Sequence, residues 1–599
     1  MKMYKALALL ALVCLDVALW ILATTPPVAG YEISIYDAYP WYFWLLIWVS
    51  IACGISILIH QAFSPDQKSR WWVAGLIIVI STNVIFLLLP LFRGYFITDL
   101  ADEVSHLGMI KQVLLEGRAS NNVYPISHIL AAEVCDVTGL DARMAMKIIP
   151  IFFYLLYMMG LYLLARTMVE KMGTRLLTMA LGSVLLFLYF EYLFLPTQLL
   201  LCLVPLTLML LAKKRTTKDR LAYTVLLIVV LILMPFTHPF GSLCVVATLL
   251  TAVISALVNR FLSRRDQRRS EGGSFPASSV ILPAAILFVT FSLWFYHTSV
   301  FGKAVMDAYR SIMSGNGRSE ASMIAEKGRQ GGITLVVFLK LFINTNGHDL
   351  IFMLLSVLAI LLVLREWRRS RAAPKADHMF LALLFMFFTL FYAATLVGTF
   401  ADVGQTRTMC WALMASTLLN GVVLHEWAIR LNGARLRLCV SLLTLAVLAS
   451  AVIGLLSVFP SPHIGVPGGQ ATEMDWNGME WFLERKTNDE TLYLASEFPR
   501  RAPEAIYGWE SPKQAAAGAF SRIPPGFGYR DNETLAYAFD SDRYIVITEF
   551  DRAYFIDLWK NVTDMVTADD FNKLDADPSV NKIYSNGELD IMHVSTASG

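Results

Sequence analysis

Four polar residues whose types could do chemistry stand close together in one stretch: Asp99, Asp102, Glu103 and His106. On a helix, Asp102 and His106 would share one face, because residues three or four apart are neighbours. A positioned carboxylate can take the proton of an attacking hydroxyl group, and hard divalent cations prefer carboxylate ligands. The stretch therefore suggests a general base or a cation site. The alternative is a solvated helix start, where the helix dipole favours acidic residues.

A second histidine lies in a matching context. His106 and His128 each follow a serine, and His128 ends the sequence Tyr-Pro-Ile-Ser-His. The spacing of apolar residues over 104–115 predicts a helix that lies on a membrane surface. The apolar piece around 124–140 is too short and too interrupted to span a membrane. The repeated Ser-His context favours a functional site over a simple helix start.

Two more polar residues stand at the ends of apolar runs: His238 at an abrupt turn between two short spans, and Arg407 at the outer end of a late span. An arginine can make bidentate contacts with a phosphate group, so Arg407 is a candidate phosphate ligand. It could also be an interfacial arginine whose stem lies along apolar surface. His238, in the sequence Phe-Thr-His-Pro-Phe, could line a cavity or simply cap a helix.

The composition places most of the chain in a lipid bilayer. Of its 599 residues, 56% are hydrophobic and only 16% are charged, whereas soluble proteins carry about a quarter charged residues. One large core cannot explain the difference, because single cores stop growing at about 250–300 residues. The net charge of +2 gives no electrostatic case for binding nucleic acid. The seven cysteines form no CxxC pair, so they suggest no metal site.

A transmembrane helix needs about 20 mostly apolar residues, and on that basis the chain has about thirteen spans. They are expected near 5–24, 41–62, 71–93, 143–165, 176–194, 197–212, 221–237, 240–259, 277–299, 347–364, 378–398, 407–425 and 438–459. The fold class is therefore a polytopic α-helical membrane protein, and a small C-terminal α/β domain follows the last span.

Lysine and arginine are distributed unevenly between the two sets of loops. The loops at 166–175, 213–220, 260–269 and 365–375 are rich in them, and the loop at 25–40 has none. Positively charged loops stay in the cytoplasm. We therefore expect the N-terminus to be cytoplasmic and the C-terminal domain to lie outside, with the chain in the plasma membrane. The first span is expected to be an uncleaved anchor, the alternative being a signal peptide.

This topology places the long non-membrane segments outside. The membrane domain is expected over residues 1–459, with outer loops at 94–142 and 300–346, and the soluble α/β domain over 460–599. Strand-like runs and the Ser585-Asn586-Gly587 turn signal indicate a hairpin near the end. The basic loop at 300–346 is hypothesised to be a mobile cover over a phosphate, or else a segment that binds anionic lipid headgroups.

Residues 94–166 resemble the GT-C superfamily of membrane glycosyltransferases. The shared features are an acidic residue in a large outer loop, a helix at the membrane surface, a Tyr-Pro-x-x-His segment and then a span. The resemblance is to enzymes of the protein O-mannosyltransferase, oligosaccharyltransferase and lipid A aminoarabinose transferase type. It implies that Asp102-Glu103 holds the catalytic carboxylate, with Asp99 as the next candidate.

One departure from that pattern concerns the place of the loop. In many GT-C members the catalytic loop follows the first span, whereas three spans precede it here. Either two spans are added, or the loop at 25–40, which contains Glu32 and Asp37, is the catalytic one. The tyrosines and tryptophans around these two acids also fit an interfacial aromatic belt.

The resemblance implies transfer of a sugar from a polyprenyl-phosphate carrier to a glycan or protein acceptor on the outer face. Asp102 would act as base, and Glu103 or Asp99 would orient the acceptor or hold a divalent cation such as magnesium or manganese. Arg407, His106, His128 and His238 would bind the substrate and its phosphate. The alternatives are a transporter or flippase of lipid-linked sugars and a non-catalytic scaffold of a surface-glycan complex.

Overall fold

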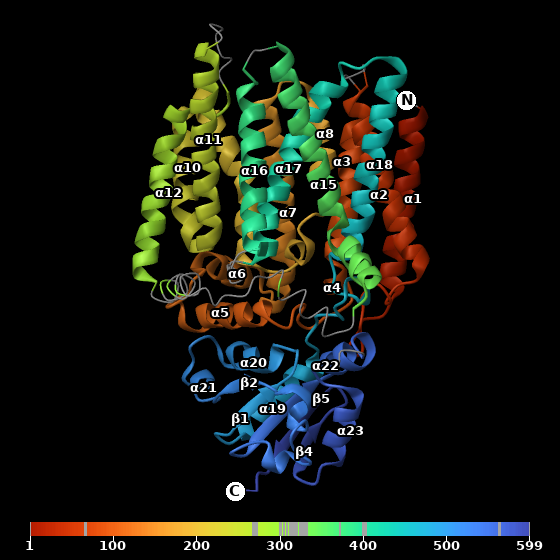
Figure 1. Ribbon diagram of the computed structural model, residues 1–599, viewed down its shortest axis with the longest axis vertical. Helices are drawn as coiled ribbons and strands as arrows, with labels where there is room; N and C mark the ends of the chain where they lie inside the picture. Colours follow the sequence, from red (N-terminus) through yellow and green to blue (C-terminus); the bar gives the residue numbers. More distant parts are fainter. Residues whose placement is uncertain are drawn as a thin grey trace.

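The computed structural model describes residues 2–64, 69–265, 273–298, 333–370, 373–397, 404–560 and 565–597, with the single residues 302, 306, 310 and 322. Most of the loop at 300–346 lies outside these residues, as does Asp402. Figure 1 shows a bundle of long helices with a small sheet domain attached at one end. We call that end of the bundle the domain face.

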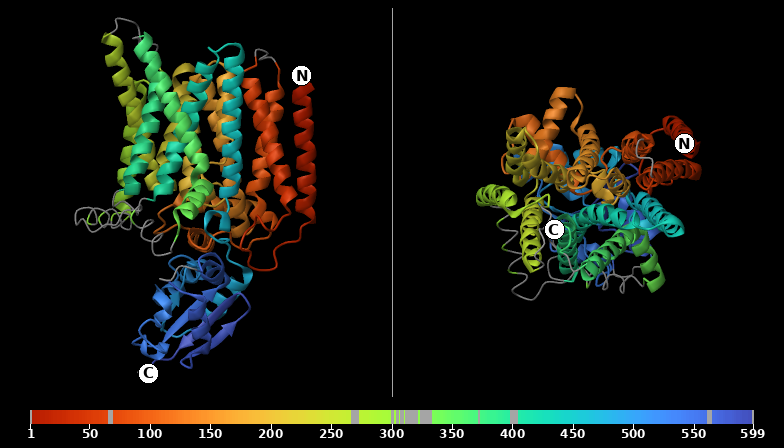
Figure 2. Two further views of the ribbon diagram at one scale, coloured as in Figure 1. Left: turned by 45° about the vertical axis from the view of Figure 1, so that its right-hand side comes forward. Right: turned by 90° about the horizontal axis from the view of Figure 1, so that it is seen from above.

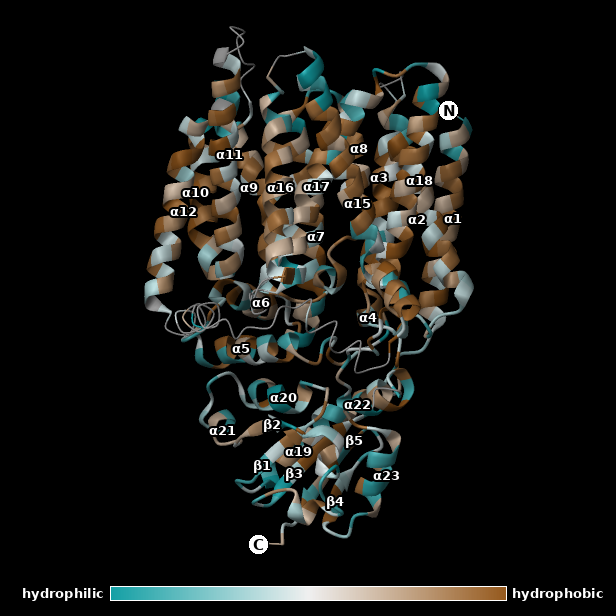
Figure 3. Ribbon diagram, viewed as in Figure 1, coloured by the Kyte–Doolittle hydropathy of each residue, from teal (hydrophilic) through white to brown (hydrophobic). Residues whose placement is uncertain are grey.

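Within the described ranges, eleven helices are long and apolar enough to cross a membrane. They are α1 (Lys2–Thr24), α2 (Trp41–Ala62), α7 (Ala142–Met168), α9 (Pro196–Thr216), α10 (Arg220–Thr237), α11 (Pro239–Arg265), α12 (Ala277–His297), α15 (Leu335–Ser370), α16 (Ala376–Val397), α17 (Gln405–Ala428) and α18 (Gly433–Ser457). The hydropathy colouring in Figure 3 shows their apolar middle sections. The predicted class, a polytopic helical membrane protein with a small α/β domain, is confirmed.

The other two predicted spans are shorter helices. The span expected at 71–93 consists of α3 (Trp71–Leu87), which has 17 residues, and the single turn α4 (Leu89–Phe92). The span expected at 176–194 begins as the 11-residue helix α8 (Met172–Gly182). An irregular segment with one 3-10 turn, η1 (Leu188–Glu191), follows it. This segment contains the buried aromatic residues Phe187, Phe190, Tyr192 and Phe194, and the last of these contacts α5 at the domain face.

The two ends of the chain lie at opposite ends of the molecule. The N-terminus is at the end of the bundle remote from the domain, and Figure 2 shows the same arrangement in a turned view. The helix ends remote from the domain carry basic residues, among them Arg175 in α8, Arg220 in α10 and Arg365 in α15. Because the chain begins at the end with these basic residues and leaves the bundle at the other end, it passes through the bundle an odd number of times.

Two helices at the domain face lie across the ends of the others. They are α5 (Asp102–Glu116) and α6 (Pro125–Thr138), and neither spans the bundle (Figure 1). Each ends at a glycine in the left-handed conformation, with φ of 67° at Gly117 and 74° at Gly139, which is a common way to stop a helix. The surface helix predicted over 104–115 is therefore present, and it is covered on its second side by the C-terminal domain.

The C-terminal domain contains a five-stranded sheet in the order β2-β1-β3-β5-β4. The strands are β1 (Glu490–Tyr493), β2 (Phe520–Arg522), β3 (Arg543–Thr548), β4 (Val580–Ser585) and β5 (Leu589–Val594). β1 runs parallel to β2 and β3, whereas β5 is antiparallel to β3 and β4. Gly587, with φ of 95°, forms the predicted turn between β4 and β5. The short strand β2 was not predicted.

The domain is packed onto the bundle through a shared hydrophobic core. This core contains Val104 and Ile110 of α5 together with Met479 and Phe482 of α19 (Glu473–Arg485) and Phe498 of α20 (Phe498–Tyr507). Apolar burial of this kind is the main stabilising term in protein association. The domain is thus docked on α5 through side-chain contacts, in addition to its covalent connection through the linker.

A close approach between the two helices α5 and α20 lies at Gly108 in α5. A Cβ atom at this position would lie 2.3 Å from the carbonyl oxygen of Glu504 in α20. The backbone also bonds across the contact, because the N–H of Trp509 donates to the carbonyl of Gly108 at 3.2 Å. Only glycine allows the two helices to lie this close.

We expect Gly108→Ala to displace the C-terminal domain from α5. Overpacking of a close contact costs about 1–3 kcal/mol, so the linker at 458–472 should be cut faster in limited proteolysis. Gly347→Ala is the matched control, because the nearest atom to a Cβ there is the flexible Cδ1 of Ile453 at 3.3 Å. Equal cleavage rates for the two variants would contradict the proposed role of the close approach.

Candidate functional site

Asp99 lies in the turn that leads into α5. Its Oδ2 atom accepts the backbone N–H groups of Ala101 and Glu103 at 3.1 and 3.4 Å. The side chain therefore caps the free N–H groups at the start of the helix. Burial, followed by the negative charge of Asp102, raises the pKa of Asp99 to about 6.

Glu103 points into the protein and links two segments of backbone. Its Oε2 atom accepts the N–H and the hydroxyl of Thr98, and its Oε1 atom accepts the N–H of Phe194 at 3.2 Å. Burial raises the pKa of Glu103 to about 7. This placement differs from the expectation that Glu103 acts on a substrate, because both carboxylate oxygens are already used to hold the 98 and 194 segments together.

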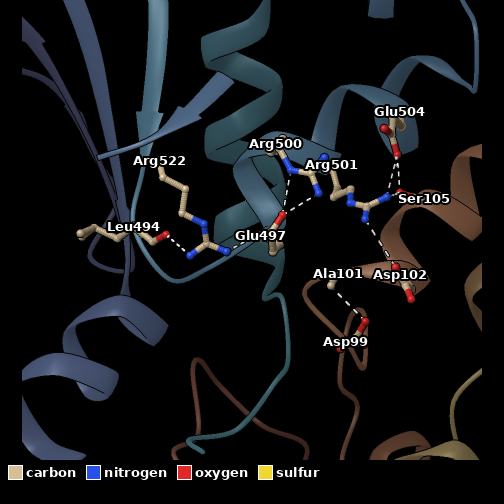
Figure 4. Close-up of polar contacts among 10 residues, drawn as sticks. All are labelled: Asp99, Ala101, Asp102, Ser105, Leu494, Glu497, Arg500, Arg501, Glu504 and Arg522. Atoms are coloured by element: carbon tan, nitrogen blue, oxygen red, sulfur yellow. Dashed lines mark hydrogen bonds and ion pairs between the residues drawn. The ribbon is translucent and has the colours of Figure 1, made fainter. Parts of the chain in front are cut away.

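Asp102 is the carboxylate of the stretch that remains open. Its side chain is 48% exposed, and its Oδ1 atom lies 3.4 Å from a guanidinium nitrogen of Arg501 in α20. Figure 4 shows that Arg501 also reaches Ser105, one turn further along α5, and that Glu504 contacts the same serine. The C-terminal domain thus contributes side chains to the surroundings of Asp102.

His106 and His128 form a hydrogen-bonded pair. The Nδ1 atom of His106 and the Nε2 atom of His128 are 3.0 Å apart, and the Nδ1 atom of His128 lies 3.0 Å from the Oδ1 atom of Asn122. That oxygen also accepts the N–H of Tyr124. His128 therefore donates from Nδ1 and accepts at Nε2, so that His106 donates from Nδ1 and keeps a lone pair on Nε2.

The two histidines are neutral at physiological pH. Burial lowers the pKa of His106 to about 4 and lowers that of His128 well below its ordinary value. Each ring also sits beside the other, so a proton on one disfavours a proton on the second. As neutral rings they add no positive charge for a phosphate. Only His106 keeps a ring nitrogen, Nε2, that has no hydrogen-bond partner among the described residues and can bind a substrate.

Tyr124 connects this pair to His238 at the turn between α10 and α11. The rings of Tyr124 and His238 are stacked with centroids 5.2 Å apart, and Tyr124 lies 6.0 Å from the ring of His106. His238 accepts the N–H of Gly241 at Nδ1, so its Nε2–H donates to the hydroxyl of Thr197 at 2.8 Å. His238 is fully buried and fixed at both nitrogens.

Arg407 lies in the first turn of α17, the central helix whose apolar window is entirely buried. After burial, its positive charge is among the causes that lower the pKa of His106, so the guanidinium lies within electrostatic range of the cluster. Within the described part of the chain, no carboxylate forms an ion pair with Arg407. Four parts of the chain thus meet at the domain face: α5 with Asp102 and His106, α6 with His128, the turn between α10 and α11 with His238, and the start of α17 with Arg407.

The alternative loop at 25–40 is arranged differently. Glu32 is paired with Arg93 and also accepts the hydroxyl of Tyr95 at 3.1 Å. The loop binds the domain linker, where the N–H of Gly468 donates to Ile33 at 2.7 Å. Its acidic residue is therefore occupied in holding the loop, while Asp37 is exposed.

The carboxylates proposed as a cation site do not converge. Among the residues that the structure describes, no group of three or more His, Cys, Asp and Glu side chains is arranged to hold a metal ion. Glu103 faces Thr98 and Phe194, whereas Asp102 faces Arg501. These residues do not fit a divalent cation bound by Asp99, Asp102 and Glu103 together.

Several residues near the site could not be identified as site residues from the sequence. Arg501 and Glu504 lie about 400 positions from Asp102, and only the docking of α20 brings them to α5. Asn122 and Thr197 are common polar residues whose importance depends on the histidines that they orient. The sequence contains Arg500 and Arg501 side by side, but no local pattern indicates that only Arg501 reaches α5.

Glu103→Gln tests the buried carboxyl through the pH dependence of stability. The pKa of Glu103 is about 7 in the folded protein, against an ordinary value of 4.5. Between these two values the folded protein holds a proton that the unfolded chain releases, so raising the pH lowers the free energy of unfolding. We expect the melting temperature of the wild type to fall relative to that of Glu103→Gln over this pH range, as followed by intrinsic fluorescence in detergent.

The exposed carboxylate of Asp136 in α6 provides the control for this experiment. Asp136→Asn should melt in parallel with the wild type at every pH. Parallel curves for the wild type and Glu103→Gln would show that the Glu103 carboxyl titrates at its ordinary value.

Comparison with known proteins gives structural likenesses only. No family model matches the chain, and no curated protein matches its sequence. Among solved structures, the chain is similar to the oligosaccharyltransferase of Archaeoglobus fulgidus in its apo form, with a TM-score of 0.49 and 11% identity, over 84% of this chain and 72% of that one.

Two further similar structures come from bacteria. ArnT from Cupriavidus metallidurans, bound to undecaprenyl phosphate, has a TM-score of 0.45 and 10% identity, over 90% of this chain and 99% of that one. The arabinofuranosyltransferase AftD from Mycobacteria has a TM-score of 0.44 and 12% identity, over 89% of this chain and 42% of that one. Oligosaccharyltransferases are one of the GT-C groups that residues 94–166 resemble. With TM-scores below 0.5, these likenesses carry no statement about the activity of this chain.

Proposed function

We propose that this protein is a membrane glycosyltransferase that moves a sugar from a polyprenyl-phosphate carrier to an acceptor at the domain face. The observation that carries the proposal is the meeting of three features at one end of an apolar bundle: an open carboxylate, Asp102, a histidine cluster, and Arg407, which forms no ion pair with the residues that the structure describes. The GT-C-like sequence of residues 94–166 supports it. The outer side of the plasma membrane is the side on which the basic loops would place this face.

Asp102 is the proposed general base. An acceptor hydroxyl would give its proton to the carboxylate while its oxygen forms a bond to the anomeric carbon of the sugar. The bond between that carbon and the carrier phosphate breaks, and the electron pair leaves with the phosphate. Half of the Asp102 side chain is exposed, so an acceptor can reach it. Asp99 is the second candidate for this role.

Arg407 is the proposed ligand of the carrier phosphate. The leaving phosphate needs positive charge as its bond breaks, and the neutral histidines cannot provide it. His106 would orient the substrate by a hydrogen bond at Nε2, while His128, whose two ring nitrogens are occupied, would hold His106 in place. The ring nitrogens of His238 are also occupied, so it would act by stacking on Tyr124. Arg407 stands in the first turn of α17, and the rest of that helix is mostly buried and apolar, which suits a ligand with a lipid tail and a charged head. The C-terminal domain would recognise the glycan or protein acceptor.

A transporter of lipid-linked sugars is the second candidate function. One observation favours it: His348 and Asp349 in α15 are both buried, with Nε2 and Oδ1 3.0 Å apart. Ionisable residues inside membrane helices are costly and commonly mark transport pathways. Transport and transfer can be separated in one reconstituted system.

Asp102→Asn should abolish transfer by protein reconstituted in liposomes with a labelled polyprenyl-phosphate sugar and an acceptor. Loss of a general base costs about a hundredfold or more in rate. The control is Asp136→Asn, which removes an exposed carboxylate from α6 and should transfer at the wild-type rate. If neither the wild type nor the variants transfer or hydrolyse the sugar while the labelled lipid crosses the bilayer, the protein is a transporter.

Arg407→Gln should raise the KM for the carrier. A hydrogen bond to a charged group contributes about 1.5–3 kcal/mol, so we expect a rise of about tenfold to a hundredfold. Arg368→Gln is the charge-matched control, because Arg368 lies in the last turn of α15, remote from the domain face. An unchanged KM together with an unchanged kcat for Arg407→Gln would remove the arginine from the phosphate site.

A further inference from the structure

Arg500 and Arg501 are adjacent in α20 but serve different partners. Arg500 lies 2.7 Å from Glu497 within the C-terminal domain, and Arg522 binds the same carboxylate. Arg501 points the other way, towards α5, where it donates to the hydroxyl of Ser105 at 2.6 Å and lies 3.4 Å from Asp102 (Figure 4). Of the two arginines, only Arg501 leaves its own domain.

The guanidinium of Arg501 is held in a partly buried position. Its side chain is 22% exposed, and its Nε atom is buried without a hydrogen-bond partner. A charge in such surroundings needs a counter-charge. Glu504 is 3.9 Å away and already accepts the Ser105 hydroxyl. Burial raises the pKa of Glu504, which makes it the weaker anion. Asp102 is therefore the main carboxylate facing Arg501.

The contact uses only one oxygen of Asp102. Oδ1 faces Arg501, whereas Oδ2 has no hydrogen-bond partner among the residues that the structure describes. The carboxylate is thus oriented through one oxygen, and the other stays open for an acceptor hydroxyl. Arg501 therefore leaves one oxygen of Asp102 accessible and does not block the carboxylate.

Arg501 cannot move independently of the docked domain. Two residues just beyond it in the chain bind α5, because the carbonyl of Ile506 accepts the Lys111 ammonium and the N–H of Trp509 donates to Gly108. Together with the close approach at Gly108, these bonds fix the distance between α20 and α5. The place of Arg501 next to Asp102 therefore depends on docking.

We propose that Arg501 is a positioning residue that the C-terminal domain supplies to the transfer site. By holding Asp102 and Ser105 it sets the direction of the carboxylate and makes transfer depend on the docked domain. This inference rests on the proposed function, since it assigns a partner to the proposed base. It also gives the domain a part in the reaction step, in addition to recognition of the acceptor.

The test compares Arg501→Gln, Arg501→Lys and Arg500→Gln in the reconstituted transfer assay. We expect the kcat of Arg501→Gln to fall about tenfold to a hundredfold, because small misplacements of a catalytic group cost that much. The KM for the carrier should stay within about threefold, since Arg501 is not the proposed phosphate ligand. Arg501→Lys should recover part of the rate, and Arg500→Gln should match the wild type.

Thermal unfolding of Asp102→Asn, Arg501→Gln and the double variant checks the contact without any activity. Non-additive shifts in melting temperature support the pairing, and additive shifts overturn it. An active wild type with an unaffected Arg501→Gln, or with an equally impaired Arg500→Gln, overturns the inference and leaves the proposed function standing. A wild type that transfers no sugar overturns the proposed function and this role of Arg501 with it.

Discussion

The close contact between α5 and α20 at Gly108 is the constraint on which the candidate site depends. The missing side chain lets two backbones approach to a distance that a Cβ would forbid. That approach brings Arg501 to Asp102 and closes a hydrophobic core shared by the bundle and the domain. This contact joins the membrane part of the chain to the sheet domain together with the backbone bonds of Ile97 with Ala471 and of Gly468 with Ile33.

Burial decides which polar residues of the site can carry charge. His106 and His128 are buried against each other, so both are neutral and serve as hydrogen-bonding groups. Glu103 is buried too, and its oxygens hold the backbone at Thr98 and Phe194. Among the described residues of the site, the charged groups without a buried partner are Asp102 and Arg407, one of each sign. This division between structural and available charges gives the site its proposed chemistry of proton removal and phosphate binding.

The main role of the helix bundle is to fix the positions of the polar side chains of the candidate site. The turn between α10 and α11, the segment after η1 and the start of α17 all reach the domain face, where His238, Thr197 and Arg407 meet α5 and α6. Because α17 is surrounded by other helices, its first turn has little freedom to move. A rigid scaffold of this kind suits a site that must align a lipid-borne substrate with a base.

The sequence by itself determined the membrane class, eleven of the expected spans and the presence of a small C-terminal α/β domain, because apolar length and turn residues are local signals. It also indicated the stretch from Asp99 to His106 as a candidate site. Tertiary structure alone decided that Glu103 is turned inward, that His106 pairs with His128, and that Arg501 faces Asp102. Those outcomes depend on contacts between residues up to about 400 positions apart, and on burial, which no local pattern encodes. Hydropathy is enough to identify the long helices of the bundle, but which side chains contact one another depends on how the helices pack.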